Sequence, residues 1–384
     1  MANMPWLLLL MIMTQMMESC GQAKRDILIQ WKAAGTLADV SSTQSIGIAG
    51  PVAGIHNNVL IVGGGANFPE AMPWNGGKKK YYTALYAFTK EANTLKVQKE
   101  ISHLPIPVAY GASCSTDKGI IYAGGESETG LSNIVFLIRW YVVEKKIVIT
   151  RLTDLPYAVA NASLVQLGNT IYLLGGETTE GTTAQVLSLD LSKPVSQWQT
   201  LASLPQPVSH AVAVAYPESK PTHIYLVGGR KRNPSGISTI YSTVTKYNVE
   251  QNKWHVEKPL PYVICAGTGI ASDNYILLFG GDTGETFSRV EKLIAAIGAE
   301  QDEIKKQKLI QQKNKLQENH PGFNKVMLAY NFRNDSWLQM DSIPHNVAVT
   351  TTAVKWGDDV IIPSGEIRAG VRTPQLLLGK LIQK

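Results

Sequence analysis

A short apolar run that ends in paired glycines, or in Ser-Gly in its last copy, recurs six times along the chain. This repeat constrains the fold more than any other feature of the sequence. The six runs are "LIVGGGA" (60–66), "IIYAGGE" (120–126), "IYLLGGE" (171–177), "IYLVGGR" (224–230), "ILLFGGD" (276–282) and "VIIPSGE" (360–366). A fixed period near 50 residues is typical of proteins built from one supersecondary unit per repeat.

The phase of each repeat is set by a Leu-Pro or Ile-Pro step about twenty residues before most of the glycine pairs. These steps begin at Leu104, Leu155, Leu204, Leu260 and Ile343, and tryptophan lies six residues before three of them, at Trp198, Trp254 and Trp337. The apolar runs are short, rich in Val, Ile and Tyr, and bounded by Gly, Pro and Asn, which indicates strands and not helices. The sequence therefore predicts an all-β, six-bladed kelch-type β-propeller with four antiparallel strands in each blade.

The last repeat has only three candidate strands, at 347–355, 359–363 and 375–382, before the chain ends. The N-terminal segment "DILIQW" (26–31) resembles an outer strand and carries Trp31. Pairing it with the last three strands would close the ring and leave no exposed sheet edge. We therefore predict that the N-terminal strand completes the sixth blade.

The fifth repeat is longer than the others, because 84 residues separate Gly281 from Gly365. The extra segment lies at about 283–321 and has the composition of a helix. It carries apolar residues at helical spacing and ends in His320-Pro321-Gly322. We expect a helical insertion between the second and third strands of the fifth blade, either capping a pocket or decorating the surface.

The first 20 residues indicate an export signal. The apolar run at 6–17 is too short to span a bilayer and is followed by Glu18, Ser19 and Cys20. Two hypotheses are open for "MESC" (17–20), namely ordinary cleavage and lipid attachment to Cys20. We expect one propeller domain over 21–384, in the periplasm, with membrane attachment only through a lipidated Cys20. The sequence does not indicate an oligomeric state.

The net charge of +6 on 384 residues is a mild bias toward anionic ligands. It lacks the dense Lys and Arg clusters of a nucleic-acid-binding face, so we expect no nucleic-acid partner. The chain also lacks a Gly-x-Ser-x-Gly elbow, a Walker loop, a His-Glu-x-x-His helix and clustered Cys/His spacing. We expect no metal and no cofactor, which leaves simple binding or acid–base chemistry.

Propellers usually bind ligands at the mouth of the central channel, where two sets of loops meet. Close after the glycine pairs come Asn67, Glu126, Glu177, Arg230, Asp282 and Glu366, and the residues six positions past a Leu-Pro step include Tyr110, Asn161 and His210. We take Asn67, Tyr110, Asn161, His210 and Arg230 as candidate substrate-binding residues. Glu366 differs because Arg368 and Arg372 lie close to it in one glycine-containing loop.

Four segments resemble the bacterial N-acetylneuraminate epimerases, the sialic acid mutarotases, which are six-bladed kelch propellers. They are "GGGANFPEA" (63–71), "GGKKKYY" (76–82), "YAGGESETG" (122–130) and "SGEIRAGVRT" (364–373). The segment resembling "SGEIRAGVRT" precedes the one resembling "GGGANFPEA" in that family, whereas here it lies near the C-terminus. This order resembles the cyclically permuted mutarotase group. The glycine pairs are common to all kelch proteins, and the Glu-x-x-x-x-x-Arg-Thr loop is more specific.

The resemblance implies that Glu366 is the catalytic base and that Arg372 is the essential arginine. It also implies that the substrate is N-acetylneuraminate or a related sialic acid, whose α and β anomers the enzyme interconverts without a cofactor. A non-catalytic kelch propeller that binds a glycan or a protein is the alternative. The enzyme hypothesis requires Glu366 and Arg372 to converge in the channel mouth and not to point into the packing between blades.

Overall fold

The protein is described from a computed structural model that covers residues 27–37, 45–98, 101–193, 196–216 and 223–383. The N-terminal segment in which we predict an export signal lies outside these residues. Within the described ranges, no helix combines the length and the apolar character needed to cross a membrane.

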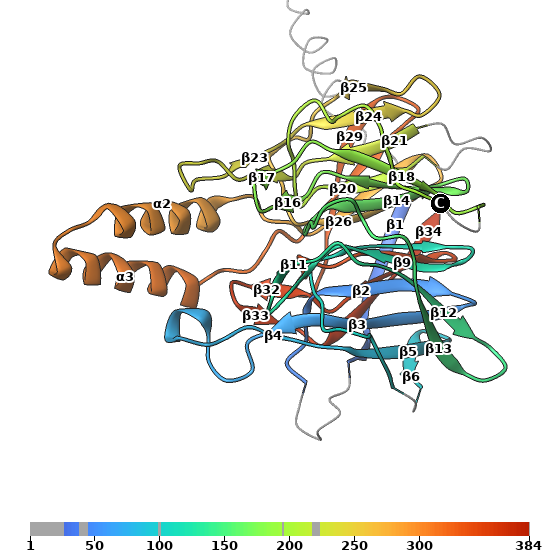
Figure 1. The fold of residues 1–384 in the computed structure, drawn as a ribbon, viewed down its shortest axis with the longest axis horizontal. Helices are drawn as coiled ribbons and strands as arrows, with labels where there is room; N and C mark the ends of the chain where they lie inside the picture. The colour runs from blue at the N-terminus through green and yellow to red at the C-terminus, as the bar shows by residue number, and fades with distance from the viewer. Residues whose placement is uncertain (1–26, 38–44, 99–100, 194–195, 217–222, 384) are drawn as a thin grey trace, which may run out of the picture.

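The described residues form a six-bladed propeller, as the repeats predict (Figure 1). In chain order, the strands are β2 (Ala49–His56), β3 (Val59–Asn67), β5 (Ala84–Glu91) and β6 (Thr94–Val97) in blade 1; β8 (Ala112–Thr116), β9 (Gly119–Ala123), β12 (Val135–Tyr141) and β13 (Lys146–Arg151) in blade 2; β14 (Ser163–Leu167), β15 (Thr170–Leu174), β18 (Val186–Asp190) and β19 (Gln199–Thr200) in blade 3. Blade 4 contains β20 (Val212–Ala215), β21 (His223–Val227), β24 (Val244–Asn248) and β25 (Lys253–Glu257), and blade 5 contains β26 (Thr268–Ser272), β27 (Tyr275–Phe279), β28 (Val326–Asn331) and β29 (Ser336–Ser342). Blade 6 combines β30 (Val354–Trp356), β31 (Asp359–Pro363) and β34 (Gln375–Gln383) with β1 (Ile27–Thr36).

Shorter strands extend the blades. In blade 1, β4 (Lys80–Tyr81) pairs with β3 and β7 (Ser102–His103) pairs with β5, while the 3₁₀ helix η1 (Pro73–Asn75) precedes β4. Four small hairpins follow the Gly-Gly or Ser-Gly steps of blades 2, 3, 4 and 6: β10 (Glu126–Ser127) with β11 (Gly130–Leu131), β16 (Glu177–Thr178) with β17 (Gly181–Thr182), β22 (Arg230–Lys231) with β23 (Thr239–Ile240), and β32 (Glu366–Arg368) with β33 (Val371–Arg372).

The predicted closure of blade 6 by the N-terminal strand is confirmed. β1 runs antiparallel to β34, from the pair Ile27 and Gln383 to the pair Thr36 and Gln375. The predicted strand at 347–355 is wrong in its first part, because β30 begins only at Val354. Thr350 has a φ of 50°, and this left-handed conformation turns the chain out of the sheet ladder.

Buried apolar side chains fill the spaces between neighbouring blades. The repeated tryptophans attach their outer strands to the preceding blade. The indole N–H of Trp254 donates to the carbonyl of Ala202 at 3.0 Å, and Trp198 and Trp337 each make the same bond to the preceding blade. Trp31 on β1 contacts blade 5 in the same way, through Sδ of Met327 at 3.2 Å. The N-terminal strand is therefore attached to the preceding blade by a tryptophan N–H, as the outer strands within the repeats are.

The glycine pairs join neighbouring blades through the backbone. In the pair Gly175-Gly176, the N–H of Gly176 donates to the carbonyl of Val208 in the next blade at 2.8 Å. A Cβ on Gly175, which has a φ of 61°, would lie 2.1 Å from that carbonyl oxygen. The repeat therefore requires glycine at this contact for steric as well as conformational reasons.

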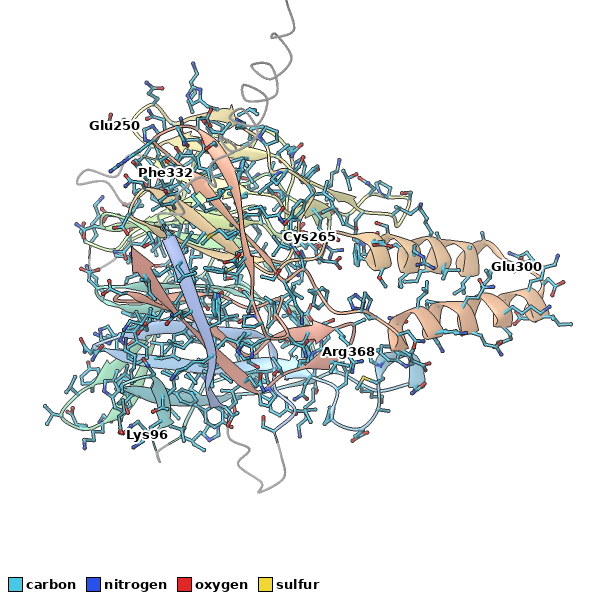
Figure 2. The ribbon with its side chains drawn as sticks, turned by 180° about the vertical axis from the view of Figure 1, so that it is seen from behind. Lys96, Glu250, Cys265, Glu300, Phe332 and Arg368 are labelled. Atoms are coloured by element: carbon cyan, nitrogen blue, oxygen red, sulfur yellow. The ribbon has the colours of Figure 1, made fainter. Side chains whose placement is uncertain are left out.

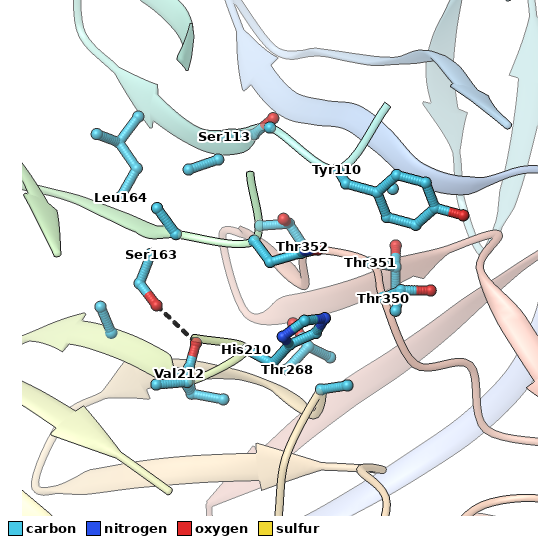
Figure 3. Close-up of a pocket in the computed structure, with 18 of the residues that line it drawn as sticks. Tyr110, Ser113, Ser163, Leu164, His210, Val212, Thr268, Thr350, Thr351 and Thr352 are labelled. Atoms are coloured by element: carbon cyan, nitrogen blue, oxygen red, sulfur yellow. Dashed lines mark hydrogen bonds between the residues drawn. The ribbon is translucent and has the colours of Figure 1, made fainter. Parts of the chain in front are cut away.

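Six residues, one from each blade, close one end of the channel with a circle of backbone hydrogen bonds. Each N–H donates to the carbonyl of the next member at 2.7 to 3.2 Å, in the order Gly50, Thr350, Ala266, His210, Asn161, Tyr110 and back to Gly50. All six have φ between 50° and 62°. The channel behind this backbone ring holds a small space of about 120 Å³ (Figure 3).

The predicted insertion forms two helices, α2 (Glu285–Ala299) and α3 (Glu303–Glu318), between β27 and β28. Residues 300–302 separate them, and Asp302 caps α3 by accepting the N–H groups of Ile304 and Lys305. The pair projects from the face that carries the small hairpins, with Glu300 at its far tip (Figures 1 and 2). No side chain of either helix is fully buried.

Candidate functional site

The hairpin β32–β33 explains why Glu366 and Arg372 are six positions apart. The two residues are direct partners in the antiparallel register, so their side chains lie on the same face. Between the strands, Gly370 has a φ of 72° and donates its N–H to Oε1 of Glu366 at 3.1 Å. A Cβ on Gly370 would meet Trp74 and Pro73 at 3.1 and 3.2 Å, because η1 packs against this turn. One short loop therefore presents both side chains together.

Glu366 is held as a carboxylate of unusually high proton affinity. Its side chain is 19% exposed, and Oε2 lies 3.1 Å from Nη2 of Arg372. Burial raises the pKa of this carboxyl, and the opposing effects of Arg372, the Gly370 N–H and Lys79 do not fully offset the burial. A carboxylate whose pKa is raised accepts a proton more readily than an exposed glutamate does, which suits a general base.

Arg372 is almost completely buried, with 4% of its side chain exposed. Its Nη2 contacts Glu366 and also donates to the hydroxyl of Tyr110 at 3.3 Å, while the ring of Phe68 lies 4.7 Å from the guanidinium carbon. Nε and Nη1 are buried and have no hydrogen-bond partner in the described part of the chain. Unpaired buried donors are costly, and an anionic ligand would satisfy them.

Blades 1 and 2 add a second charged group beside Tyr110. Oε1 of Glu126 accepts hydrogen bonds from Nζ of Lys79 and from the hydroxyl of Tyr81, both at 2.7 Å. Nζ of Lys79 also lies 4.8 Å from the centre of the Tyr110 ring. Tyr110 is therefore fixed between this ion pair and Arg372.

Blades 3 and 4 contain a separate carboxylate–arginine pair. Oε1 of Glu177 lies 3.0 Å from Nη2 of Arg230, and the Nε of Arg230 donates to Nδ1 of His210 at 3.3 Å. Burial, reinforced by the charge of Arg230, lowers the pKa of His210, so this imidazole is neutral at physiological pH. The side-chain amide of Asn161 donates to Oε2 of Glu177 at 3.3 Å.

The helical insertion supplies the remaining wall of the site. Thr286, Phe287 and Val290 of α2 face Gln317 of α3 and the following His320 and Phe323 around one cavity. Asp282, just before α2, accepts the N–H of Gly284 at 2.7 Å, and burial raises the pKa of its carboxyl. The base of the insertion therefore forms one wall of the cavity, while its tip extends away from it.

These walls enclose a cavity of about 400 Å³, within the range of small-molecule sites. Glu366, Arg372, Tyr110, Asn161 and His210 all line it, so the structure brings together five of the seven candidate residues. Arg230 is outside the lining and reaches it only through His210 and Phe287, whose ring lies 4.9 Å from its guanidinium carbon.

Asn67 also lies outside the cavity lining, because it is buried between a carbonyl and a hydroxyl. Its side-chain nitrogen donates to the carbonyl of Gly47 at 2.7 Å, and its oxygen accepts from Tyr82 at 2.8 Å. The position in blade 1 equivalent to Glu126 is Ala66, which pairs with Ala49 as Glu126 pairs with Ala109. Ala66 directly follows the three glycines of blade 1, so the choice of Asn67 as a substrate-binding candidate was wrong by one position along the chain.

Three further regions line the cavity although the sequence did not single them out as ligand contacts: Lys79 with Phe68, the first turn of α2, and the segment from Gln317 to Phe323. Lys79 and Phe68 belong to the two quoted segments of blade 1, so a signal was present for them. Over the described residues, no group of three or more His, Cys, Asp or Glu side chains is placed to hold a metal ion.

Comparison with known proteins assigns the family. A family model described as N-acetylneuraminate epimerase matches residues 14–149 and 152–384. The chain belongs to this family. The N-acetylneuraminate epimerase of Haemophilus influenzae (strain PittEE) is 24% identical over 237 residues, which are 60% of this chain and 60% of that protein. Those of Salmonella typhimurium (strain LT2) and Vibrio vulnificus (strain YJ016) are 26% and 25% identical over 228 residues, or 58% of this chain and 57% of each relative.

The epimerase family thus agrees with the resemblance seen in the sequence, and the propeller agrees with the fold that it implied. The match to each of these relatives spans 60% or less of the relative's length. The identities are also modest.

Proposed function

We propose that this member of the epimerase family interconverts the α and β anomers of N-acetylneuraminate or a related sialic acid. The observation that carries the proposal is the convergence of Glu366 and Arg372 on one cavity, with Nε and Nη1 of Arg372 unpaired. The relatives, which are N-acetylneuraminate epimerases, support the same reaction class. The substrate would enter from the face that carries the small hairpins.

The proposed reaction combines proton transfers with opening and closing of the sugar ring. In the cyclic sugar acid, the anomeric carbon carries a hydroxyl group, the carboxylate and the ring oxygen. Glu366 takes the proton of the anomeric hydroxyl as the bond from that carbon to the ring oxygen breaks, and the ring oxygen takes a proton from solvent water. The ketone group then turns about its single bond to the rest of the open chain, so that the chain hydroxyl attacks the other face of the ketone carbon. In this closing step the chain hydroxyl loses its proton to solvent, and protonated Glu366 returns its proton to the former ketone oxygen, so protons and bonds balance over the cycle.

Arg372 would hold the substrate carboxylate next to this base. Its Nη2 is occupied by Glu366 and Tyr110, whereas Nε and Nη1 offer donors in fixed directions. An anion bound there is attached to the same carbon that carries the reacting hydroxyl, so its position fixes the distance between that hydroxyl and Glu366. The arginine would act by binding and orientation, and the carboxylate by proton transfer.

The direct test is proton NMR of freshly released α-N-acetylneuraminate with and without the purified protein. We expect the protein to accelerate the approach to the anomeric equilibrium above the rate in buffer alone. Binding of the sugar without any acceleration would instead support the non-catalytic alternative. Saturation-transfer measurements at equilibrium then give exchange rates for variants without the need for a pure anomer.

The location of the protein stays a prediction, because residues 1–26 lie outside the described residues. We propose export to the periplasm, with a mature start at or near Cys20 and lipid attachment as one of two alternatives. Mass spectrometry of the cellular protein is the check. An intact Met1 would contradict processing, and a diacylglycerol-modified Cys20 would establish the lipidated form.

A further inference from the structure

The four carboxylates that follow glycine steps do not have equal partners. Glu126, Glu177 and Glu366 each lie within 3.1 Å of a cationic side chain, at Lys79, Arg230 and Arg372 respectively. Asp282 is half-buried, and no cationic side chain in the described residues lies within 4.0 Å of it. Its Oδ1 accepts the N–H of Gly284, and Oδ2 has no partner there.

The neighbouring histidine does not neutralise Asp282. Nδ1 of His320 accepts the N–H of Gly322 at 3.0 Å, so in its neutral form this ring carries its proton on Nε2. Burial lowers the pKa of His320, which favours the neutral form. The site thus holds an acceptor-only oxygen with no internal donor, on the wall shared with Phe287 and Phe323. Oδ2 is not one of the fully buried atoms that lack a partner, so a ligand in the cavity can reach it and supply hydrogen-bond donors.

The order of groups around the propeller orients the ligand. The guanidinium of Arg372 contacts Phe68 of blade 1 and Tyr110 of blade 2. Glu366 lies in blade 6, and Asp282 lies in blade 5. If the substrate carboxylate is held by Arg372 and the anomeric carbon lies beside Glu366, the rest of the sugar extends toward Asp282. That part of a sialic acid is rich in hydroxyl groups.

We infer that Asp282 is a specificity-determining residue that accepts hydrogen bonds from substrate hydroxyl groups remote from the carboxylate. This inference rests on the proposed function. Two parts of the substrate could supply the hydroxyls, namely the exocyclic polyol chain and the hydroxyl at ring carbon 4. The chemistry is the same in both cases, and the choice between them is made by analogues that lack one or the other.

The test is a thermodynamic cycle between Asp282→Asn and shortened substrates. Periodate oxidation and borohydride reduction of a sialoside, whose glycosidic bond protects the anomeric carbon, followed by release of the sugar, removes the last two carbons of the polyol chain. A 4-deoxy analogue removes the ring hydroxyl. For intact N-acetylneuraminate, we expect Asp282→Asn to lower kcat/KM for anomer exchange about 10- to 100-fold, mostly through KM, as for loss of a hydrogen bond to a charged group. For the analogue that lacks the recognised hydroxyl, the same substitution should change kcat/KM by less than about twofold.

The outcomes separate the possibilities. Equal losses on all three substrates, or a loss confined to kcat, would overturn the inference, because Asp282 would then act in catalysis or in folding. Glu180→Gln, which removes an exposed carboxylate at the tip of β16–β17 outside the cavity, is the matched control and should change nothing. If Asp282→Asn does not fold, Asp282→Ser replaces it in the same cycle.

Failure of the proposed function has a different signature. If the wild-type protein binds N-acetylneuraminate but does not accelerate exchange, the same cycle is measured on the dissociation constants. Coupling between Asp282 and one hydroxyl would then uphold the inference without the enzyme activity. If the wild-type protein binds none of the three sugars, both the proposed function and this inference are wrong.

Discussion

Two carboxylate–arginine pairs on the hairpins that follow the glycine steps have nearly the same spacing, but they differ in how many of their other donors and acceptors are paired. Glu177 and Arg230 are 3.0 Å apart, and Glu366 and Arg372 are 3.1 Å apart. Glu177 also accepts hydrogen bonds from Ser209 and Asn161, and Arg230 donates in addition to His210 and Ser238. In contrast, Arg372 leaves Nε and Nη1 without partners.

The pKa shifts of Glu177 and Glu366 reflect how completely each pair is hydrogen-bonded. Burial favours the protonated form of Glu177, but the charge of Arg230 and the hydrogen bonds from Ser209 and Asn161 oppose the burial, and the pKa of Glu177 is lowered. For Glu366 the burial is larger than the sum of its partners, and the pKa is raised. A pair whose hydrogen-bond donors and acceptors are all paired within the protein stabilises the fold. A pair that faces a cavity with unpaired donors can still bind a ligand. The ion-pair distance alone does not distinguish these roles.

The largest effect on activity is expected from Glu366→Gln. Glutamine keeps the size and can still accept from Gly370 or Arg372, but it cannot take the proton of the anomeric hydroxyl. We expect anomer exchange to fall by on the order of 10²–10⁴-fold, while the dissociation constant for N-acetylneuraminate changes little. Saturation-transfer NMR gives the exchange rate, and calorimetry gives the binding. A folded variant with the wild-type exchange rate would assign Glu366 to structure alone.

Arg372→Lys should have the next largest effect, because one ammonium cannot serve Glu366, Tyr110 and a substrate carboxylate in three fixed directions. We expect binding of N-acetylneuraminate to weaken about 10- to 100-fold, with a smaller change in the exchange rate of the bound sugar. Calorimetric titration measures the weakening. Unchanged affinity in a folded variant would mean that the unpaired nitrogens of Arg372 do not bind the anion.

Much of the fold was predictable, because the repeat reports directly on contacts between blades. Gly175 is required by the approach of Val208, Gly176 by that of Val159, and Trp254 by its bond to Ala202, so each signal had a local physical cause that recurs. Trp31 carried the same signal at the other end of the chain and located the closing strand. The start of β30 was missed because the left-handed conformation of Thr350 comes from the backbone ring, which depends on all six blades.

The candidate site was predictable where one local loop supplies both functional residues. Glu366 and Arg372 face each other because they pair across one hairpin, a relation that spacing alone can suggest. The contribution of Phe287, Gln317 and Phe323 depends on how the insertion leaves the blade, and no periodicity in the sequence indicates that direction. The pairing of Arg230 within the protein was also hidden, because its partners Glu177 and His210 come from two different blades.

The pH dependence should separate the two pairs. Glu366 must be deprotonated to act as a base, so kcat/KM should fall as pH decreases through its raised pKa, above the ordinary value of 4.5. Glu177 differs because its pKa is lowered, and the effect of its titration is on the stability of the fold. Its pair contributes stability above the pKa of the unfolded chain, and that stability is lost only as pH falls toward the lower folded value.

Activity should therefore decline on the acid side while the protein is still folded. The measurement is kcat/KM against pH, with circular dichroism recorded at each point. An acid limb that coincides with unfolding would contradict the assignment of a raised pKa to the proposed base.

The smallest effect on exchange is expected from Glu177→Gln, the matched substitution in the pair that is hydrogen-bonded within the protein. Because neither Glu177 nor Arg230 lines the cavity, kcat/KM of the folded protein should stay within about threefold of wild type. Stability should fall by on the order of 1–3 kcal/mol, since Arg230 would lose its nearer counterion and keep only Glu291, whose Oε1 lies 3.9 Å from Nη1 of Arg230. The double variant Glu177→Gln with Arg230→Met removes both charges and should recover part of this loss. Denaturant titration measures the stability of each variant, and NMR measures exchange in the same samples. A large loss of exchange in folded Glu177→Gln would show that this pair also acts on the substrate, and the contrast between the two pairs would fail.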